Sequence, residues 1–313
     1  MAVESIQEAR PEGPARVLDL GERLAARRRR EGRVGPEAAP DGAGRDLRVM
    51  AVCSGKGGVG KTNLVVNLGV ALQRLGRRVI VLDADLGLAN VDTLLGLQPS
   101  ATLRDVLLGE CPLTEALLAG PEGIRIVPAS SGFDDVTQLS GPQRLHLLEE
   151  FDQLEEDFDV LLIDTGAGIS SNVTFFAVAA NEILLVVTPE PTALTDAYAL
   201  IKVLSRRYAE RDFGVIVNMT RGSREGEATW RHLSRVTERF LGVSLHLAGI
   251  VPFDGELPTA VRRQRPLLDL APTSPAARSI ERLARGLLAA PPEKLPKGGL
   301  QFFFERLLSG EGR

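Results

Sequence analysis

A glycine-rich loop after residue 53 constrains the fold more than any other feature of this sequence. It reads Ser-Gly-Lys-Gly-Gly-Val-Gly-Lys-Thr over residues 54–62, between an apolar run at 48–53 and a helical pattern at 62–75. This satisfies the G-x-x-x-x-G-K-[ST] pattern in the strand–loop–helix setting that the pattern requires. In that setting, backbone N–H groups and the positive end of the helix dipole surround phosphate groups. We therefore expect the loop to bind a nucleotide.

The loop residues have separate expected roles. Lys61 should reach the β- and γ-phosphates, and the Thr62 hydroxyl should ligate Mg²⁺. The glycines let N–H groups turn toward the phosphates without a Cβ clash. The expected nucleotide-binding residues of this segment are Gly55, Gly57, Gly58, Val59, Gly60, Lys61, Thr62 and Asn63.

Apolar runs alternate with helical patterns over residues 47–290. The runs lie at 48–53, 78–82, 124–127, 160–163, 183–187, 214–217 and 245–251, and the helical patterns at 62–75, 142–156, 194–207, 227–241 and 275–288. Runs that are apolar throughout are typical of parallel strands buried on both faces. The pattern predicts one α/β domain with a doubly wound, mostly parallel sheet of seven to eight strands and helices on both faces.

Two segments flank this domain. Residues 1–47 contain a short basic helical pattern and then a glycine- and proline-rich linker, and residues 291–299 form a second linker. The last segment, within 291–313, places five apolar residues on one helical face: Leu300, Phe303, Phe304, Leu307 and Leu308. So short a helix is unstable alone in water and must dock, either on its own domain or on a membrane. Lysines at 294 and 297 favour an anionic membrane surface.

Composition narrows the other possibilities. A formal net charge of −4 disfavours a bulk electrostatic nucleic-acid binder, and two cysteines cannot build a disulfide framework. The sequence shows neither a secretory signal nor a spanning apolar stretch, so we expect a cytoplasmic protein. The three histidines lack metal-ligand spacing, and G-x-S-x-G and C-x-x-C motifs are absent from the sequence.

Carboxylates follow two of the predicted strands. The run at 78–82 continues into Asp-Ala-Asp-Leu-Gly-Leu-Ala-Asn-Val-Asp over residues 83–92, and the run at 160–163 is followed by Asp164. Ligands of parallel sheets bind at the carboxyl ends of strands. Because four apolar residues and then an aspartate form a Walker B pattern, we expect Asp164 to bind Mg²⁺ directly or through water.

Lys56 places a second lysine in the loop, although the chain has only five lysines in all. A lysine after the first glycine marks the deviant Walker motif of the MinD/ParA family, which this chain resembles over residues 47–290. The resemblance implies that Lys56 reaches across an ATP-dependent homodimer to the partner's phosphates. It also implies that Asp85 orients the attacking water and that Asp83 lies near the magnesium shell.

The sequence also bears on the nucleotide base. The N-K-x-D element of GTP-selective proteins is absent from the sequence, which favours ATP. Asn218 resembles the family residue whose amide reads adenine, and Pro252 and Phe253 would form the other wall of the base pocket. Gly166, in the D-T-G-A-G run after the predicted fourth strand, replaces a proline that many relatives carry.

Within the family, four features resemble the flagellar-number regulators (FlhG, also called FleN or YlxH): Asn63, the 83–92 run, D-T-G-A-G and V-N-M at 217–219. This resemblance implies a slow, Mg²⁺-dependent ATP hydrolase that works as a switch. It would dimerise with ATP, attach reversibly to the inner membrane face through its tail, and regulate flagellar number and placement. An FlhF-like GTPase and flagellar switch proteins are the implied partners. The D-Q-A-x-x-L-R motif of those regulators is only partly kept at 19–25.

Two alternatives stay open. One is a ParA-like cargo positioner that binds DNA non-specifically, because Arg231, Arg235 and Arg239 recur at i, i+4 and i+8. Such a stripe is more often a solvated helix face, so nucleic-acid binding is not the leading expectation. The other is a septum-site MinD, which shares the mechanism but has different partners.

Overall fold

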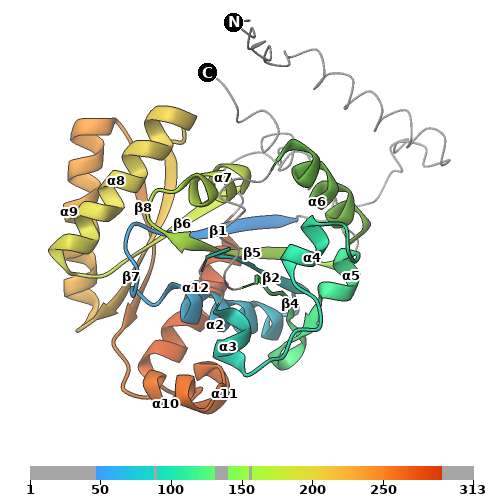
Figure 1. Ribbon diagram of the computed structural model, residues 1–313. Coiled ribbons are helices and arrows are strands. Elements are labelled where there is room, and N and C mark those ends of the chain that lie inside the picture. Colours follow the sequence, from blue (N-terminus) through green and yellow to red (C-terminus); the bar gives the residue numbers. More distant parts are fainter. Residues whose placement is uncertain (1–46, 88–89, 131–139, 155–156, 291–313) are drawn as a thin grey trace, which may run out of the picture. The chain divides into compact units, whose positions relative to one another are not determined.

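The computed structural model describes residues 47–87, 90–130, 140–154 and 157–290. An eight-stranded sheet with the order β3-β4-β2-β5-β1-β6-β7-β8 forms its centre (Figure 1). The strands are β1 (Arg48–Ser54), β2 (Val79–Ala84), β3 (Leu118–Ala119), β4 (Arg125–Val127), β5 (Val160–Ala167), β6 (Glu182–Val187), β7 (Asp212–Thr220) and β8 (Ser244–Pro252). Neighbouring strands run parallel, apart from β3 against β4. The predicted fold class is confirmed.

Helices cover both faces of the sheet (Figure 1). One face carries α2 (Lys61–Arg74), α3 (Val91–Leu95), α10 (Leu257–Arg262), α11 (Leu267–Leu270) and α12 (Pro275–Ala289). The other carries α4 (Leu103–Leu107), α5 (Leu113–Ala116), α6 (Gly141–Leu154), α7 (Ser171–Ala179), α8 (Pro191–Tyr208) and α9 (Ser223–Leu241). A 3₁₀ turn, η1 (Pro121–Gly123), precedes β4.

Burial on both faces explains why the strand sequences are apolar throughout. Along β1, Val49 and Ala51 join the hydrophobic cluster on one face, whereas Met50 and Val52 join the cluster on the other. Successive side chains of a strand point to opposite faces, so each position needs an apolar residue here. Polar residues of the central strands are therefore confined to the strand ends, and those at the carboxyl ends meet at one edge of the sheet.

The structure also differs from the sequence expectations in several elements. Helix α7 lies in a segment so apolar that it shows no helical periodicity, and Ser170 begins it by accepting a hydrogen bond from the Val173 N–H at 3.4 Å. Strand β5 continues to Ala167, so Asp164 lies within the strand and not after it. The short elements β3, α3, α4, α5, α10 and α11 were not predicted, because two to six residues carry too little periodicity.

Two predicted segments lie outside the described residues. These are the basic N-terminal helix with its linker and the apolar tail with Leu300, Phe303, Phe304, Leu307 and Leu308. Within the described part of the chain, none of the helices combines the length and the apolar character needed to cross a bilayer.

Candidate functional site

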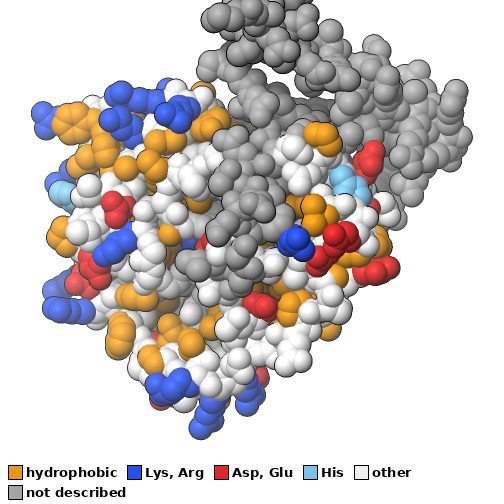
Figure 2. Space-filling view, viewed as in Figure 1, with side chains coloured by type: hydrophobic (Ala, Val, Ile, Leu, Met, Phe, Trp, Pro, Cys, Tyr) orange, Lys and Arg blue, Asp and Glu red, His pale blue; other side chains and the backbone are white. Residues whose placement is uncertain are grey.

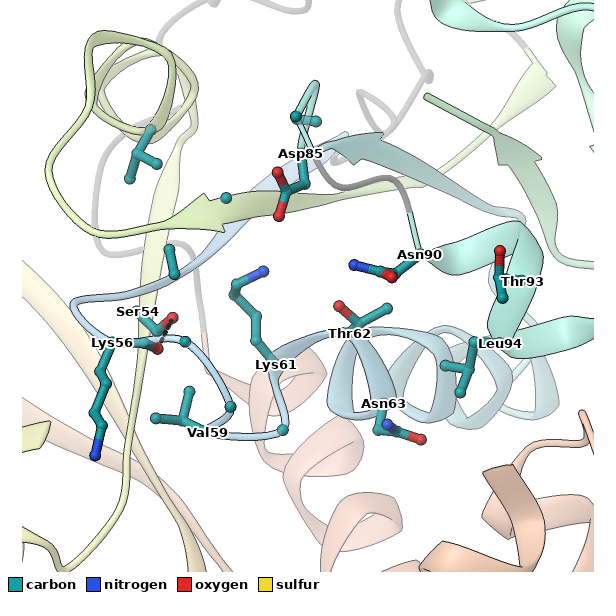
Figure 3. A pocket seen from close by; sticks show the side chains of 18 of the residues that line it. Ser54, Lys56, Val59, Lys61, Thr62, Asn63, Asp85, Asn90, Thr93 and Leu94 are labelled. Carbon is teal, nitrogen blue, oxygen red and sulfur yellow. Dashed lines mark hydrogen bonds between the residues drawn. The ribbon is translucent and has the colours of Figure 1, made fainter. Parts of the chain in front are cut away.

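A cleft of about 960 Å³ opens at the carboxyl edge of the sheet, over the glycine-rich loop (Figure 3). The loop between β1 and α2 forms its floor, and the ends of β2 and β5 together with α3 form its sides. Of the residues predicted from the loop pattern, the cleft is lined by Lys56, Gly57, Gly58, Val59, Gly60, Lys61, Thr62 and Asn63. Asp85, which follows strand β2, lines it as well.

Two glycines of the loop are required by close packing. A Cβ at Gly55 would lie 2.2 Å from the backbone carbonyl carbon of Asp196, so the loop is seated directly on the backbone of α8. Gly60 has a φ of 82°, and a Cβ there would lie 2.6 Å from Asn218 Nδ2. Gly60 immediately precedes α2, so this turn aims the first free N–H groups of the helix at the cleft.

Lys61 forms an ion pair with Asp164 under the cleft. Its Nζ lies 2.7 Å from Asp164 Oδ1 and also donates to the carbonyl of Thr165, and both charged side chains are more than 90% buried. Burial raises the pKa of Asp164, while the charge and hydrogen bond of Lys61 and a hydrogen bond with Thr62 oppose that rise. The lysine therefore occupies, in this state, the carboxylate that the sequence assigns to magnesium.

Thr62 and Asp164 are suited to the predicted metal. Both offer oxygen donors, and their side chains hydrogen-bond to each other, so one ion could contact both. Mg²⁺ usually takes one or two protein oxygens, and phosphate oxygens and water complete its shell. The described residues contain no cluster of three or more His, Cys, Asp or Glu side chains fit to hold a metal. A metal here would thus depend on the phosphates of a bound nucleotide.

Asp83 is buried beside Asp164, to which it is paired in the β2–β5 register. Its carboxylate accepts three backbone N–H bonds, from Asp85 and Asn90 at 3.1 Å each and from Val91 at 3.2 Å. Burial and the charge of Asp164 raise its pKa to about 7. These bonds fold the loop that carries Asp85 and hold the first turn of α3, while the metal role of Asp83 stays a prediction.

Asp85 and Lys61 both point into the cleft (Figure 3). A Cβ at Gly166 would lie 3.4 Å from Asp85 Oδ1, an ordinary contact distance, so residue 166 lies directly beside this carboxylate. Asp85 thus lines the same cleft as the loop residues, and its role with the attacking water stays a prediction.

Lys56 differs from Lys61 because its ammonium group is directed away from the cleft (Figure 3). Its Nζ lies 2.7 Å from Glu190 Oε2 and 3.0 Å from Thr192 Oγ1, at the start of α8. The Lys56 side chain remains 38% exposed. Within one chain, therefore, Lys56 is not bonded to the groups around Lys61, and its charge lies on the outer side of the loop.

A second, mostly apolar cavity of about 140 Å³ adjoins the loop at Gly60 and Asn63. The three residues predicted for the base pocket, Asn218, Pro252 and Phe253, all line it. Asn218 Nδ2 donates to the Val59 carbonyl at 2.8 Å, which fixes the amide so that its Oδ1 is the acceptor end. The structure therefore brings the predicted base residues together beside the predicted phosphate residues.

Sequence reasoning missed several residues of these two sites. The cavity is also lined by Met219, Leu257 and Pro258, and Met219 has a φ of 57°, a strained value for a side-chain-bearing residue. Glu190, which holds Lys56, was missed too. The start of α8, with proline after Glu190, was the available signal, because such a helix start places side chains at the strand edge.

The arginines of the predicted stripe lie on α9, where Figure 2 shows blue and orange side chains gathered over the α8–α9 region. Arg231, Arg235 and Arg239 are exposed. Arg231 pairs with Glu227 at 2.6 Å, and the Arg239 guanidinium lies 5.3 Å from the centre of the Phe240 ring, which is 59% exposed. The stripe is therefore a solvated face that is partly neutralised.

Comparison with known proteins agrees with this geometry. The ParA family model, described as NUBPL iron-transfer P-loop NTPase, matches residues 47–288. The chain is 48% identical over 262 residues to the antiactivator FleN of Pseudomonas aeruginosa, which covers 84% of this chain and 94% of that protein. It is 35% identical to the flagellum site-determining protein YlxH of Helicobacter pylori, over 84% of this chain and 90% of that protein.

Solved structures show the same relationship. The septum site-determining protein MinD from Pyrococcus horikoshii, complexed with Mg-ADP, superimposes with a TM-score of 0.65 at 28% identity. The match covers 80% of this chain and all of that one.

Proposed function

Because the chain belongs to the ParA/MinD family of P-loop NTPases, we propose that it is an ATP-hydrolysing switch that closes as a homodimer and regulates flagellar number and placement. One observation carries this proposal: the loop lysine, the Walker B carboxylate and the loop threonine converge under a cleft that Asp85 overhangs. Its FleN and YlxH relatives support the flagellar role.

Nucleotide binding would exchange partners at the floor of the cleft. Lys61 would exchange Asp164 for the β- and γ-phosphates, and Asp164 and Thr62 are the residues that would hold Mg²⁺. The bound ion would neutralise charge on the phosphate oxygens. Asp85, which already points into the cleft, would orient the water that attacks the γ-phosphate. Asp83 would keep the Asp85 loop in place from below.

The fixed amide of Asn218 supports ATP as the substrate. Its Nδ2 is used by the Val59 carbonyl, so Oδ1 is the group left to act as an acceptor toward a base in the cavity that Asn218 lines. Adenine presents an amino donor at its six-position, where guanine presents a carbonyl oxygen. An acceptor opposite a carbonyl leaves two lone pairs unmatched in a small apolar cavity, which disfavours GTP.

The outward direction of Lys56 supports the dimer. A lysine turned away from its own cleft could exchange Glu190 for a second copy that docks at this edge of the sheet. Ile169 and Phe253, which follow β5 and β8, are exposed apolar residues. Each copy would then supply its Lys56 to the phosphates of the other. Two tails presented together would attach more strongly to a membrane than one tail alone.

The proposal is tested with purified protein, ATP and Mg²⁺. We expect ATP hydrolysis, an ATP-dependent dimer by light scattering, and loss of both in Lys56→Ala with nucleotide affinity kept. Liposomes of anionic lipid should pellet the full chain with ATP more than with ADP, and should not pellet a chain that ends at Ala290. A monomer in ATP with ordinary turnover would contradict the switch, and equal pelleting of all samples would contradict the membrane step.

The arginine face of α9 favours a second candidate, a ParA-like positioner that binds DNA. Electrostatic DNA binding weakens steeply with salt. ATP-dependent binding of random duplex DNA that is lost in Arg235→Glu would support this candidate, whereas absence of binding at low salt would exclude it. Co-purification with a flagellar GTPase or with a division inhibitor would separate the flagellar role from a septum-site role.

A further inference from the structure

The five-residue helix α3 is held at both ends by side chains from other elements. At its N-terminal end, the carboxylate of Asp83 accepts the N–H groups of Asn90 and Val91. At its C-terminal end, Gln264 Nε2 donates to the Thr93 carbonyl at 3.0 Å, across 171 positions of sequence. A helix this short is not stable by itself, so its position depends on such contacts.

Two features show that the position of Gln264 against α3 is constrained: its backbone angle and its close approach to Gly96. Gln264 has a φ of 52°, a left-handed value that a side-chain-bearing residue seldom adopts. A Cβ at Gly96, the residue that ends α3, would lie 2.7 Å from Gln264 Oε1, so the glycine is what lets this side chain approach. Gln264 also lines the nucleotide cleft beside Thr93.

The segment that carries Gln264 begins at the base cavity. Leu257 and Pro258, at the start of α10, form part of the cavity wall. Beyond Gln264, the Leu268 N–H donates to Asn67 Oδ1 at 3.0 Å, which joins α11 to the helix that follows the phosphate loop. Residues 257–268 therefore contact the base cavity, α3 and α2 in turn.

The loop that carries Asp85 connects the end of β2, at Asp83, to the start of α3. Its first part is bonded to Asp83, which receives the Asp85 N–H at 3.1 Å, and its last part leads into α3. The Asp83 carboxylate accepts the Asp85 N–H on one oxygen and the N–H groups of Asn90 and Val91 on the other, so a shift of α3 acts on Asp85 through this carboxylate.

We infer that Gln264 is a positioning residue that ties the wall of the base cavity to the loop carrying Asp85. A base seated in the cavity fixes α10, Gln264 then fixes α3, and α3 fixes the height of Asp85 over the phosphates. The effect on turnover rests on the proposed ATPase function, whereas the tether itself does not.

Two variants both remove the side-chain N–H donor of Gln264 but differ in their effect on the backbone. Gln264→Glu keeps the length and the backbone preference but has no N–H to donate. Gln264→Gly removes the side chain and relieves the left-handed φ. Arg263→Ala, at the exposed neighbouring position, is the control.

Hydrogen exchange tests the tether on nucleotide-free protein. The amides of Leu94, Gly96 and Leu97 donate hydrogen bonds within and just after α3. Their exchange rates should rise in both Gln264 variants and stay at the wild-type value in the control. ATP should slow their exchange more than inorganic triphosphate in the wild-type chain, and that difference should vanish in Gln264→Glu. Wild-type exchange in both variants would overturn the inference, whatever the protein hydrolyses.

Turnover tests the link to Asp85. We expect kcat to fall about tenfold in both Gln264 variants, as for other small misplacements of reacting groups, with the Kd for ATP kept within about twofold. A merely structural loss would lower affinity and thermal stability together. Faster exchange of α3 with unchanged kcat would refute the link, and a wild-type protein without ATPase activity would refute the proposed function instead.

Discussion

The Lys61 ammonium lies 2.7 Å from the Asp164 carboxylate in a site almost closed to water, so the lysine of the phosphate loop forms a buried ion pair with the Walker B aspartate. An ion pair this deeply buried is costly to break by removing one partner, because the other charge is left without compensation. Neither charge can therefore lose its partner without a replacement, and the proposed exchange for phosphate and metal would couple nucleotide binding to the floor of the cleft.

Replacing Lys61 with Met should therefore affect stability as well as nucleotide binding. We expect a loss of about 3–5 kcal/mol in unfolding free energy at pH 7.5, since Asp164 would stay buried and charged. The loss should shrink as the pH falls from 7.5 to 5, because burial already raises the pKa of Asp164 and removal of the lysine charge raises it further. Urea denaturation at the two pH values measures this. An equal loss at both would contradict a charge-based cause.

Glycines of the phosphate loop should differ sharply in their tolerance of alanine. In Gly55→Ala the new methyl would meet the Asp196 backbone at 2.2 Å, so the loop must lift from α8 at a cost of about 1–3 kcal/mol, with nucleotide binding lost. Gly57→Ala is the matched control, since a Cβ there has no neighbour within 4 Å. Thermal unfolding compares them, and similar melting temperatures would show that the seating on α8 is unimportant.

Asn218→Ala should relax base selectivity. The variant removes the acceptor that matches the adenine amino group, so the preference for ATP over GTP should fall by about tenfold, as for one hydrogen bond. Competition binding of the two nucleotides measures the ratio. If GTP were excluded equally well by wild type and variant, the cavity walls and not the amide would set the selectivity.

Asp83 should make the nucleotide-free protein less stable as pH rises toward neutrality. Its folded pKa of about 7 lies above the ordinary value of 3.8, so the folded chain keeps a proton that the unfolded chain has released. The stabilisation present below pH 4 is therefore lost between about pH 4 and pH 7, by at most about 1.4 kcal/mol for each pH unit. In Asp83→Asn this slope should flatten. Unfolding titrations at pH 5, 6 and 7 check it, and parallel slopes would rule out Asp83 as the source.

Much of the site could be predicted from the sequence because its residues come where a buried apolar strand ends and polar residues begin. The loop with Lys61 and Thr62 follows a fully buried strand, and Asp83 and Asn218 come at or near the ends of others, so the topology of a parallel sheet gathers them at one edge. The short elements carried no such signal. Helix α3 has five residues, and it is held by Asp83 at one end and at the other by Gln264, far along the chain.

By itself, the sequence determined the sheet, the phosphate loop and the family, because buried strands and phosphate-binding turns each demand particular residue types within a short stretch. Tertiary structure alone decided the partners of those residues. Lys61 pairs with Asp164, Lys56 points outward to Glu190, and the Asp83 carboxylate accepts hydrogen bonds from backbone N–H groups. The physical reason is that charges and hydrogen-bond donors choose partners by distance and burial in three dimensions, and no local pattern records which partner lies nearest.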